Sequence, residues 1–362
     1  MVPVRAAADA IDWEALDRVV AVINGKGGVL KTALTAHLAG LTAQAPDYRV
    51  LAVDLDVQGN LALDFGVQSS SDQGQGLMQS VFLGKPLEPL REVRPDLDLV
   101  TGGRELGTLS AFIAQQAMSQ RDPDLPLRAL ATSLAPIAGD YDFIFIDCPP
   151  GEEVLQQMAL GAARWVLIPT RTDKASREGM VAVAERFIRA REGKAPQALD
   201  LLAVVLAGVN PSASALRANA LAAMKEDLEA FGADAERLLT ATIVRYAETV
   251  AVGARDRGLL VPELVNVAAE AEPWWQALRD GRPRSDVGRY QSASGEGLAD
   301  DYFALAAEVL GRIGEEEAAQ RAGVQDEQLQ DGAEETDGEA GPRAPEHAEV
   351  GQLPTQTQGV RA

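Results

Sequence analysis

Short apolar runs alternate with longer segments of helical pattern along most of this chain. Most of the runs are continuously apolar, which is typical of parallel strands that helices cover on both faces. The predicted strands are 19–24, 49–54, 97–100, 142–147, 165–169, 201–206 and 240–244. The predicted helices are 32–43, 106–118, 152–162, 176–191, 213–231, 247–257 and 300–313. The alternation predicts a doubly wound α/β fold, with a mostly parallel sheet between two layers of helices.

The glycine-rich segment GKGGVLKT, residues 25–32, lies between the first predicted strand and the first predicted helix. Its glycines let backbone N–H groups approach phosphate oxygens, and the helix N-terminus adds partial positive charge. Lys31 is placed to reach the β- and γ-phosphates, and the Thr32 hydroxyl to bind Mg²⁺. This pattern predicts a P-loop. The candidate nucleotide contacts are Gly25, Lys26, Gly27, Gly28, Val29, Leu30, Lys31, Thr32 and Ala33.

Lys26, directly after the first glycine, resembles the deviant Walker A box of the ParA/MinD family of ATPases. Three further boxes follow in the family's order. VLAVDLDVQGN at 50–60 is similar to the D-x-D-x-Q switch, YDFIFIDCPP at 141–150 to the Walker B strand, and VLIP at 166–169 to the next core strand. The similarity runs from about residue 19 to about 313 and is greatest to ParA/Soj-type partition proteins. It implies a P-loop NTPase fold of the SIMIBI type.

The resemblance also implies roles for single residues, with ATP and Mg²⁺ as cofactors. Asp56 would orient the attacking water beside the γ-phosphate and help to hold Mg²⁺, and Asp147 would hold a magnesium-bound water. Lys31 would neutralise phosphate charge, and Lys26 would cross a nucleotide-sandwich homodimer to the partner's phosphates. The catalytic candidates are therefore Lys26, Lys31 and Asp56, and the metal candidates are Thr32, Asp56 and Asp147.

Two further segments follow strand ends. Asp54 is expected to anchor the end of its strand and the P-loop, and residues 149–151 to form a switch after the Walker B strand. Asn210 and Pro211 follow the strand at 201–206. By resemblance they contact the adenine, although an Asn-Pro pair is also an ordinary turn initiator.

Leu30 departs from the family's box, which reads K-G-G-V-G-K-T-T where this chain reads KGGVLKTA. If the position needs a positive φ, a leucine costs about 1–2 kcal/mol. If φ is negative there is no strain, and the side chain either crowds the phosphates or turns back onto neighbouring strands. Since the candidate catalytic and metal-binding residues are all present, we expect nucleotide binding to survive and ATP turnover to be slow.

Basic side chains gather on two of the predicted helices, and in ParA proteins such surfaces bind DNA without sequence preference. The DNA-binding candidates are Arg186, Arg189, Arg191, Lys194 and Arg217. The alternative is a solvated helix face with counter-charges. No helix-turn-helix pattern precedes the P-loop, so operator-specific binding is not expected.

Charge divides the chain of 362 residues, whose net charge is −21. Residues 314–362 hold twelve acidic residues against three arginines and no aromatic residue. Such a composition buries too little apolar surface to offset ordering entropy. The sequence therefore predicts an N-terminal extension (1–18), an ATPase domain (19–313) and a disordered acidic tail (314–362). The tail is either a solubilising segment or an arm that repels DNA or recruits a basic partner.

No apolar run reaches the ~20 residues that span a bilayer, and the N-terminus lacks the apolar region of a secretory signal. The single cysteine, Cys148, lies in an apolar run, which predicts a buried, inert thiol. We therefore expect a cytoplasmic, nucleoid-associated protein that does not bind membranes. One cysteine also argues against a reductase similar to the nitrogenase iron protein, which needs several cluster ligands.

The leading interpretation is a ParA-type partition ATPase. It would bind Mg-ATP, dimerise, bind DNA nonspecifically and segregate plasmid, phage or chromosomal DNA with a ParB-like centromere-binding partner. One alternative is a hydrolysis-impaired, nucleotide-dependent scaffold or switch, in which Leu30 blocks turnover. Another is a cargo-positioning ATPase similar to MinD. The acidic C-terminal segment lacks the amphipathic membrane helix of MinD proteins, which argues against membrane targeting.

Overall fold

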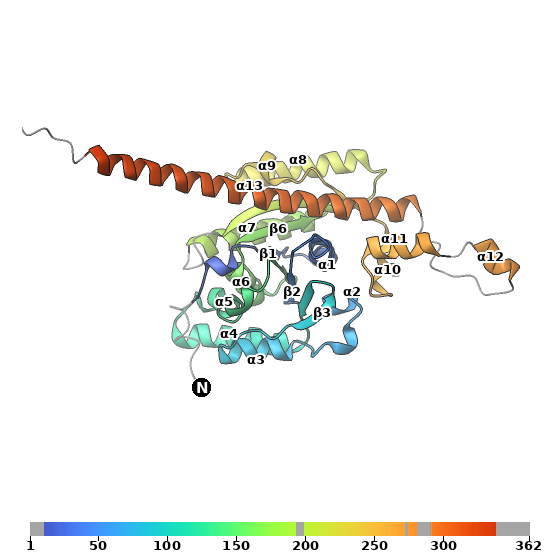
Figure 1. Cartoon of the computed structure of the whole chain (residues 1–362), viewed down its shortest axis with the longest axis horizontal. Coiled ribbons are helices and arrows are strands. Elements are labelled where there is room, and N and C mark those ends of the chain that lie inside the picture. Colours follow the sequence, from blue (N-terminus) through green and yellow to red (C-terminus); the bar gives the residue numbers. More distant parts are fainter. Residues whose placement is uncertain (1–10, 193–198, 272–273, 281–289, 291, 338–362) are drawn as a thin grey trace, which may run out of the picture. The chain divides into compact units, whose positions relative to one another are not determined.

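A computed structural model describes residues 11–192, 199–271, 274–280, 290 and 292–337. Their strands form an eight-stranded sheet in the order β3-β4-β2-β5-β1-β6-β7-β8. Figure 1 shows strands of this sheet, among them β1, β2 and β6, surrounded by helices. The strands are β1 (Val19–Val22), β2 (Val50–Asp54), β3 (Leu90–Arg94), β4 (Leu97–Val100), β5 (Phe143–Asp147), β6 (Trp165–Thr170), β7 (Asp200–Val209) and β8 (Val244–Arg245). All neighbours are parallel except β3 and β4. The predicted doubly wound, mostly parallel sheet is confirmed.

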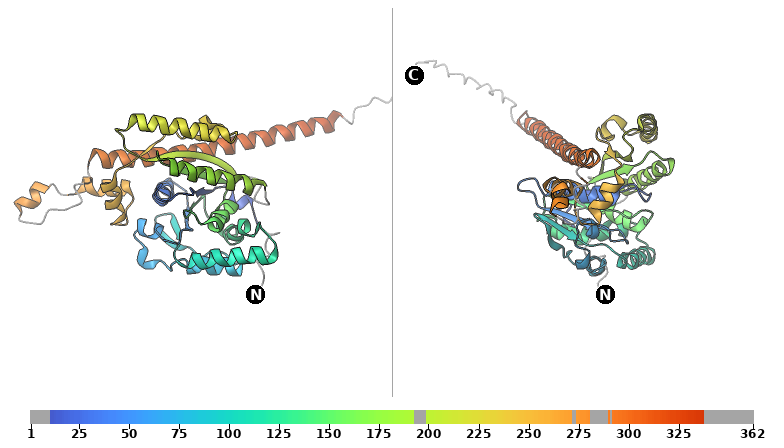
Figure 2. Two further views of the ribbon diagram at one scale, coloured as in Figure 1. Left: turned by 180° about the vertical axis from the view of Figure 1, so that it is seen from behind. Right: turned by 90° about the vertical axis from the view of Figure 1, so that its right-hand side faces the viewer.

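Helices follow most of the strands and cover both faces of the sheet. The α-helices are α1 (Lys31–Thr42), α2 (Leu61–Asp64), α3 (Gln75–Leu83), α4 (Glu105–Gln120), α5 (Leu125–Ala138), α6 (Glu153–Ala162), α7 (Lys174–Glu192), α8 (Ser214–Ala230), α9 (Ala235–Leu238), α10 (Glu248–Arg255), α11 (Val261–Glu270), α12 (Trp274–Arg279) and α13 (Ala293–Asp337). Two 3₁₀ turns add η3 (Glu14–Leu16) and η4 (Gln68–Ser70). Helices α7 and α8 lie next to each other over β7 (Figure 2).

The central strand β1 shows why the sheet forms where it does. All of its residues are buried, because helices pack on both of its faces. Val19, Ala21 and Ile23 join one core cluster with buried residues of α4 to α8. The alternate residues of a strand point to the opposite face, where α1 packs against β1 and β5. A strand covered in this way must be apolar throughout, and the sequence predicted β1, β2, β5 and β6 on that basis.

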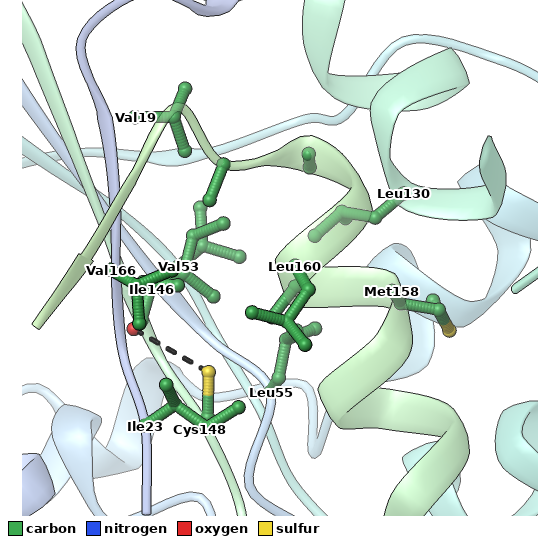
Figure 3. Close-up of a cluster of buried hydrophobic side chains, with 14 of the residues drawn as sticks. Val19, Ile23, Val53, Leu55, Leu130, Ile146, Cys148, Met158, Leu160 and Val166 are labelled. Carbon is green, nitrogen blue, oxygen red and sulfur yellow. Dashed lines mark hydrogen bonds between the residues drawn. The ribbon is translucent and has the colours of Figure 1, made fainter. Parts of the chain in front are cut away.

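Figure 3 shows part of this core around Cys148, which follows β5 directly. The thiol is fully buried among Ile23, Leu55 and Leu160, and its sulfur lies 3.9 Å from the Ile146 carbonyl oxygen. Burial raises the pKa of the Cys148 thiol well above its ordinary value, so little reactive thiolate forms. The expected buried, free cysteine is confirmed.

Several elements differ from the sequence prediction. Helices α3, α5 and α11 and the edge strand β3 were not predicted, and β8 was expected at 240–244 rather than Val244–Arg245. The segment 68–76, for which no helix was predicted, contains η4 and the start of α3. Helix α13 begins at Ala293, before the predicted start at residue 300.

These differences have local causes. Strand β3 carries largely exposed or half-buried residues on the edge of the sheet, so it lacks the apolar run of a central strand. Helix α5 contains Pro126 in its first turn and Pro136 near its end, which hides its helical pattern. Pro126 is tolerated because a first-turn N–H has no partner within the helix.

The two ends of the chain were predicted as an N-terminal extension and an acidic tail. In the predicted N-terminal extension, residues 1–10 lie outside the described part, whereas Leu16 is buried in the main core cluster. At the other end α13 continues to Asp337, so residues 314–337 of the predicted disordered tail are helical. Glu, Ala, Gln and Arg are good helix formers, and prolonging an existing helix avoids the cost of nucleation. The first compact unit ends at Arg312 and the second begins at Ile313.

Candidate functional site

The loop between β1 and α1 is held by the side chain of Asn24, which the sequence analysis did not single out. This amide is fully buried. Its Nδ2 donates to the Pro169 carbonyl at 2.8 Å and to the Ser176 carbonyl at 3.3 Å, and its Oδ1 accepts from the Lys26 N–H at 2.8 Å. Asn24 therefore ties the start of the loop to β6 and α7. A polar residue directly after an apolar strand was the signal for it.

Helix α1 begins at Lys31, and no side chain caps its N-terminus. The first-turn N–H groups of such a helix have no partner within it and suit an anion. Lys31 is buried, and its Nζ donates to the Lys26 carbonyl at 2.9 Å. Burial lowers the pKa of Lys31, against the opposing effect of Asp147, Cys148 and Asp56. Lys26 itself is exposed.

Leu30 precedes α1 in the left-handed conformation, with φ of 65° and ψ of 19°. The positive φ answers the question that the sequence left open, and a leucine there costs about 1–2 kcal/mol. The side chain is half-buried and turns towards β7. Its Cδ1 would lie 3.5 Å from a β-carbon built on Gly208 of β7.

Two aspartates meet where β2 and β5 end, since Asp54 and Asp147 are register partners. Both are fully buried. Asp54 accepts from the Asp56 N–H at 2.9 Å and the Leu61 N–H at 3.0 Å. Burial raises its pKa to about 7, against these hydrogen bonds. Asp54 therefore anchors the turn after β2 and the start of α2, and its bonds do not reach the P-loop.

Asp147 has a different environment. Neither of its carboxylate oxygens accepts a hydrogen bond of normal geometry from the described residues. Burial raises its pKa well above the usual range, and Asp54 acts in the same direction, while the Thr32 hydroxyl opposes the shift. Asp56 is also buried and accepts from the Gln58 N–H at 2.9 Å. A buried carboxylate without partners is costly unless it meets a cation, a water or a hydroxyl.

These oxygens fit a divalent cation. Thr32, Asp56 and Asp147 supply hydroxyl and carboxylate oxygens, the donors that Mg²⁺ prefers. No group of three or more His, Cys, Asp or Glu side chains in the described part could hold a metal by itself. Mg²⁺ suits such a site because it keeps several waters and takes further ligands from substrate phosphates.

The segment after β5 is tied to α6 and α7. Gln156 donates to the Pro149 carbonyl at 2.7 Å, and its Oε1 accepts from Arg186 Nη1 at 2.6 Å. That same Nη1 would lie 3.8 Å from a β-carbon on Gly25. Arg186, one of the DNA-binding candidates, is half-buried beside the P-loop. Its DNA role stays a prediction.

The other DNA candidates have mixed positions. Arg189 and Arg191 on α7 are exposed, and Arg217 on α8 is half-buried. Lys194 lies outside the described residues. Asn210 and Pro211 are exposed after β7, where Asn210 accepts from the Ser212 N–H at 3.0 Å, as in an ordinary turn. Their adenine role stays a prediction.

A pocket of about 160 Å³ adjoins the P-loop and is lined by Leu30, Ala33 and His37 together with residues of α10 and α11. Arg255 and Asp64 form an ion pair in its wall. Leu30 at the end of the loop and Ala33 in the first turn of α1 place the pocket next to the N-terminus of that helix.

No helix in the described part is long and apolar enough to cross a membrane. The chain matches a family model described as an AAA domain over residues 17–199. The chromosome partitioning protein ParA of Myxococcus xanthus is 32% identical over 189 residues, which cover 51% of this chain and 62% of that protein. ParA of Caulobacter vibrioides is 30% identical over 192 residues, which cover 52% and 68%. The match thus spans less than two thirds of the Myxococcus protein.

Solved structures agree on the fold. A variant of Cyanothece McdA in complex with ATP superposes with a TM-score of 0.60 at 18% identity, covering 81% of this chain and 96% of that one. MinD of Pyrococcus horikoshii with Mg-ADP gives 0.53 at 20% identity, covering 81% and 95%. At such identities the likeness shows the fold alone.

Proposed function

Because this chain belongs to the ParA/MinD family of P-loop ATPases, we propose that it is a ParA-type partition ATPase. It binds Mg-ATP, forms a nucleotide-sandwich homodimer and binds DNA without sequence preference. A ParB-like, centromere-binding partner stimulates hydrolysis, and the cycle segregates plasmid, phage or chromosomal DNA. The protein works in the cytoplasm, on the nucleoid. The partition relatives in Myxococcus and Caulobacter support this choice within the family.

One observation carries the nucleotide part of the proposal. The buried cation of Lys31 and the buried carboxylate of Asp147, whose oxygens accept no hydrogen bond of normal geometry from the described residues, lie at the same end of the sheet, beside an uncapped helix N-terminus. Such groups are costly to bury without a ligand, and Mg²⁺ with a polyphosphate would satisfy them together.

Thr32, Asp56 and Asp147 would hold Mg²⁺, directly or through water, and the ion would neutralise charge on the phosphate oxygens. Lys31 holds the β- and γ-phosphates from inside the loop. Asp56 orients the attacking water. Lys26, exposed at the loop surface, reaches the phosphates of the partner copy in the dimer. Phosphoryl transfer needs this positioning and electrostatic stabilisation more than covalent chemistry.

The DNA surface uses Arg189 and Arg191 on the exposed side of α7, with Lys194 and Arg217. An acidic protein binds nucleic acid only through a local basic face, because nonspecific affinity comes from neutralising phosphates. Such binding falls steeply with salt.

Leu30 favours a second function. Its left-handed backbone is strained for a leucine, and it stands directly before the phosphate-binding lysine. A loop of this kind can bind nucleotide and yet turn over slowly. The protein would then be a nucleotide-dependent scaffold, with partners held by the ATP-bound dimer.

Phosphate release by purified protein with Mg-ATP, with and without random duplex DNA, tests both functions. Lys31→Ala is the inactive control, and Leu30→Gly relieves the strain. Turnover by the parent that DNA stimulates supports the partition ATPase. Turnover by Leu30→Gly alone supports the scaffold. A Leu30→Gly protein no faster than the parent counts against slow turnover caused by Leu30.

A further inference from the structure

The backbone conformation at Leu30 is unfavourable for a leucine. It is the residue that precedes α1, its φ is positive, and its own side chain provides no cap for the helix. Leucine rarely adopts this conformation, so the surrounding structure must enforce it. Two residues lie close to this part of the loop: Gly208 of β7, and Arg171, which directly follows β6.

Gly208 lies beside the leucine side chain. Between β7 and β8, Ala207 pairs with Val244 and Val209 with Arg245, so Gly208 is an extra residue that forms a bulge. Its φ is 69°. A β-carbon at this position would lie 3.5 Å from Leu30 Cδ1 and 3.2 Å from Arg171 Nε. Bulges with glycine re-aim the chain beside functional sites. This one brings the backbone of β7 beside two side chains, Leu30 and Arg171.

Arg171 joins the two backbones. It directly follows β6, and its Nη1 donates to the Gly28 carbonyl of the P-loop at 3.3 Å. Its Nη2 donates to the Gly208 carbonyl at 3.4 Å. The guanidinium also lies over the ring of Tyr246, 5.7 Å from the centroid. A planar guanidinium can hold two acceptors in fixed directions, which a lysine cannot.

We propose that Arg171 is a positioning residue for the P-loop, which clamps Gly28 to the Gly208 bulge and thereby holds Leu30 in its left-handed conformation. A glycine would adopt that conformation freely. In this chain the shape of the loop instead depends on the unit of Leu30, Arg171 and Gly208. The role in nucleotide binding rests on the proposed function, whereas the clamp itself is argued from the contacts of Arg171 alone.

The proposal predicts energetic coupling between positions 171 and 30. Binding of Mg-ADP and Mg-ATPγS would be measured by titration calorimetry for the parent, Arg171→Ala, Leu30→Gly and the double variant. Two lost hydrogen bonds from a charged donor should weaken both nucleotides about tenfold in Arg171→Ala. The same change should cost less than about threefold when Leu30→Gly is present, because the loop no longer needs the clamp.

Arg171→Lys separates positioning from direct contact with phosphate. Lysine keeps the positive charge but cannot donate two hydrogen bonds in fixed directions. If Arg171 is a positioning residue, Arg171→Lys should therefore bind both nucleotides as weakly as Arg171→Ala does. A loss confined to Mg-ATPγS and restored by lysine would overturn the proposal in favour of γ-phosphate contact. An equal effect of Arg171→Ala with leucine or glycine at position 30 would also overturn it. Arg177→Ala removes an ion pair between Arg177 on α7 and Asp227 on α8. It is the matched control and should leave binding unchanged.

Thermal unfolding without nucleotide gives a second cycle with the same four proteins. Arg171→Ala should lower Tm more in the parent than in Leu30→Gly, and additive shifts would overturn the clamp. If no variant binds nucleotide but the unfolding cycle shows coupling, the proposed function fails and the inference stands. If the parent binds nucleotide and both cycles are additive, the inference alone fails.

Discussion

Asp54 and Asp147 stand side by side at the ends of neighbouring strands, fully buried, yet their environments are opposite. Asp54 accepts two backbone N–H groups, whereas neither oxygen of Asp147 has such a partner in the described part. The difference shows how a structural residue can be told from a ligand-binding one when both have the same type, burial and position at a strand end. A buried side chain whose hydrogen bonds are all made within the protein stabilises the fold. A buried side chain that lacks such bonds is a candidate for binding a ligand.

The two P-loop lysines show a similar contrast. Lys31 is buried with its Nζ on the Lys26 carbonyl, while the Lys26 side chain is exposed. One cation is therefore enclosed by its own loop. The other is free to act outside its own subunit, as the proposed function requires.

Lys26→Ala tests the contrast between the two lysines and should have the largest effect on ATP hydrolysis. Loss of a cation supplied by the partner copy should reduce DNA-stimulated phosphate release about 10³-fold, as for an arginine finger. The affinity of the single subunit for Mg-ADP should stay within about threefold, a loss of no more than ~0.7 kcal/mol. Parallel kinetics and calorimetry check both values. A large loss of Mg-ADP affinity would place Lys26 in the site of its own subunit.

Asp147→Asn tests the buried carboxylate that is proposed to hold Mg²⁺. Turnover should fall about 10- to 100-fold, as when a group that orients a metal-bound water is removed. Thermal stability should not decrease, because a buried carboxylate without partners becomes a neutral amide. Phosphate release and Tm are the two measurements. A fall in Tm at unchanged turnover would give Asp147 a structural role instead.

Asp54→Ala tests the satisfied carboxylate. It leaves the Asp56 and Leu61 N–H groups buried without an acceptor, which should lower the free energy of unfolding by about 2 kcal/mol. Urea denaturation measures the change. Asp54→Asn keeps one acceptor oxygen and should cost less. If both variants match the parent in stability, the contrast between the two aspartates is wrong.

His37 is a third satisfied group, and it predicts a dependence on pH. Its Nε2 accepts from the Val261 N–H at 2.9 Å, its Nδ1 lies 2.6 Å from the Ala33 carbonyl oxygen, and its ring stacks on Tyr302. This pattern needs neutral imidazole, and burial lowers its pKa to about 4. The stabilisation is complete above the unfolded pKa of 6.5 and is lost as the pH falls towards the folded value.

Acidification from pH 7.5 to 5 should therefore cost about 2 kcal/mol through His37. Urea denaturation across this range measures the loss. His37→Gln removes the titrating ring, so its stability should fall less steeply with acid. Equal slopes for the two proteins would contradict the assignment.

Much of the fold and site followed from local pattern. The strands β1, β2, β5 and β6 are buried on both faces, so their apolar runs were visible, and the chemical residues follow their ends. The edge strand β3 and the helix α5 were not visible. One carries exposed residues, and the other begins and ends near prolines. The bond between Arg186 and Gln156 was not visible either, because residue type does not show which side chains a neighbouring helix will contact.

The sequence by itself determined the parallel sheet, the P-loop and the carboxylates at its edge, because alternating apolar runs and glycine spacing act over a few residues. Only the tertiary structure decided which of these groups are satisfied. The φ of Leu30, the bulge at Gly208 and the reach of Arg171 depend on β6, β7 and the P-loop together. Residues about 140 and 180 positions apart make those contacts, and loop closure over such lengths leaves no local trace in the chain.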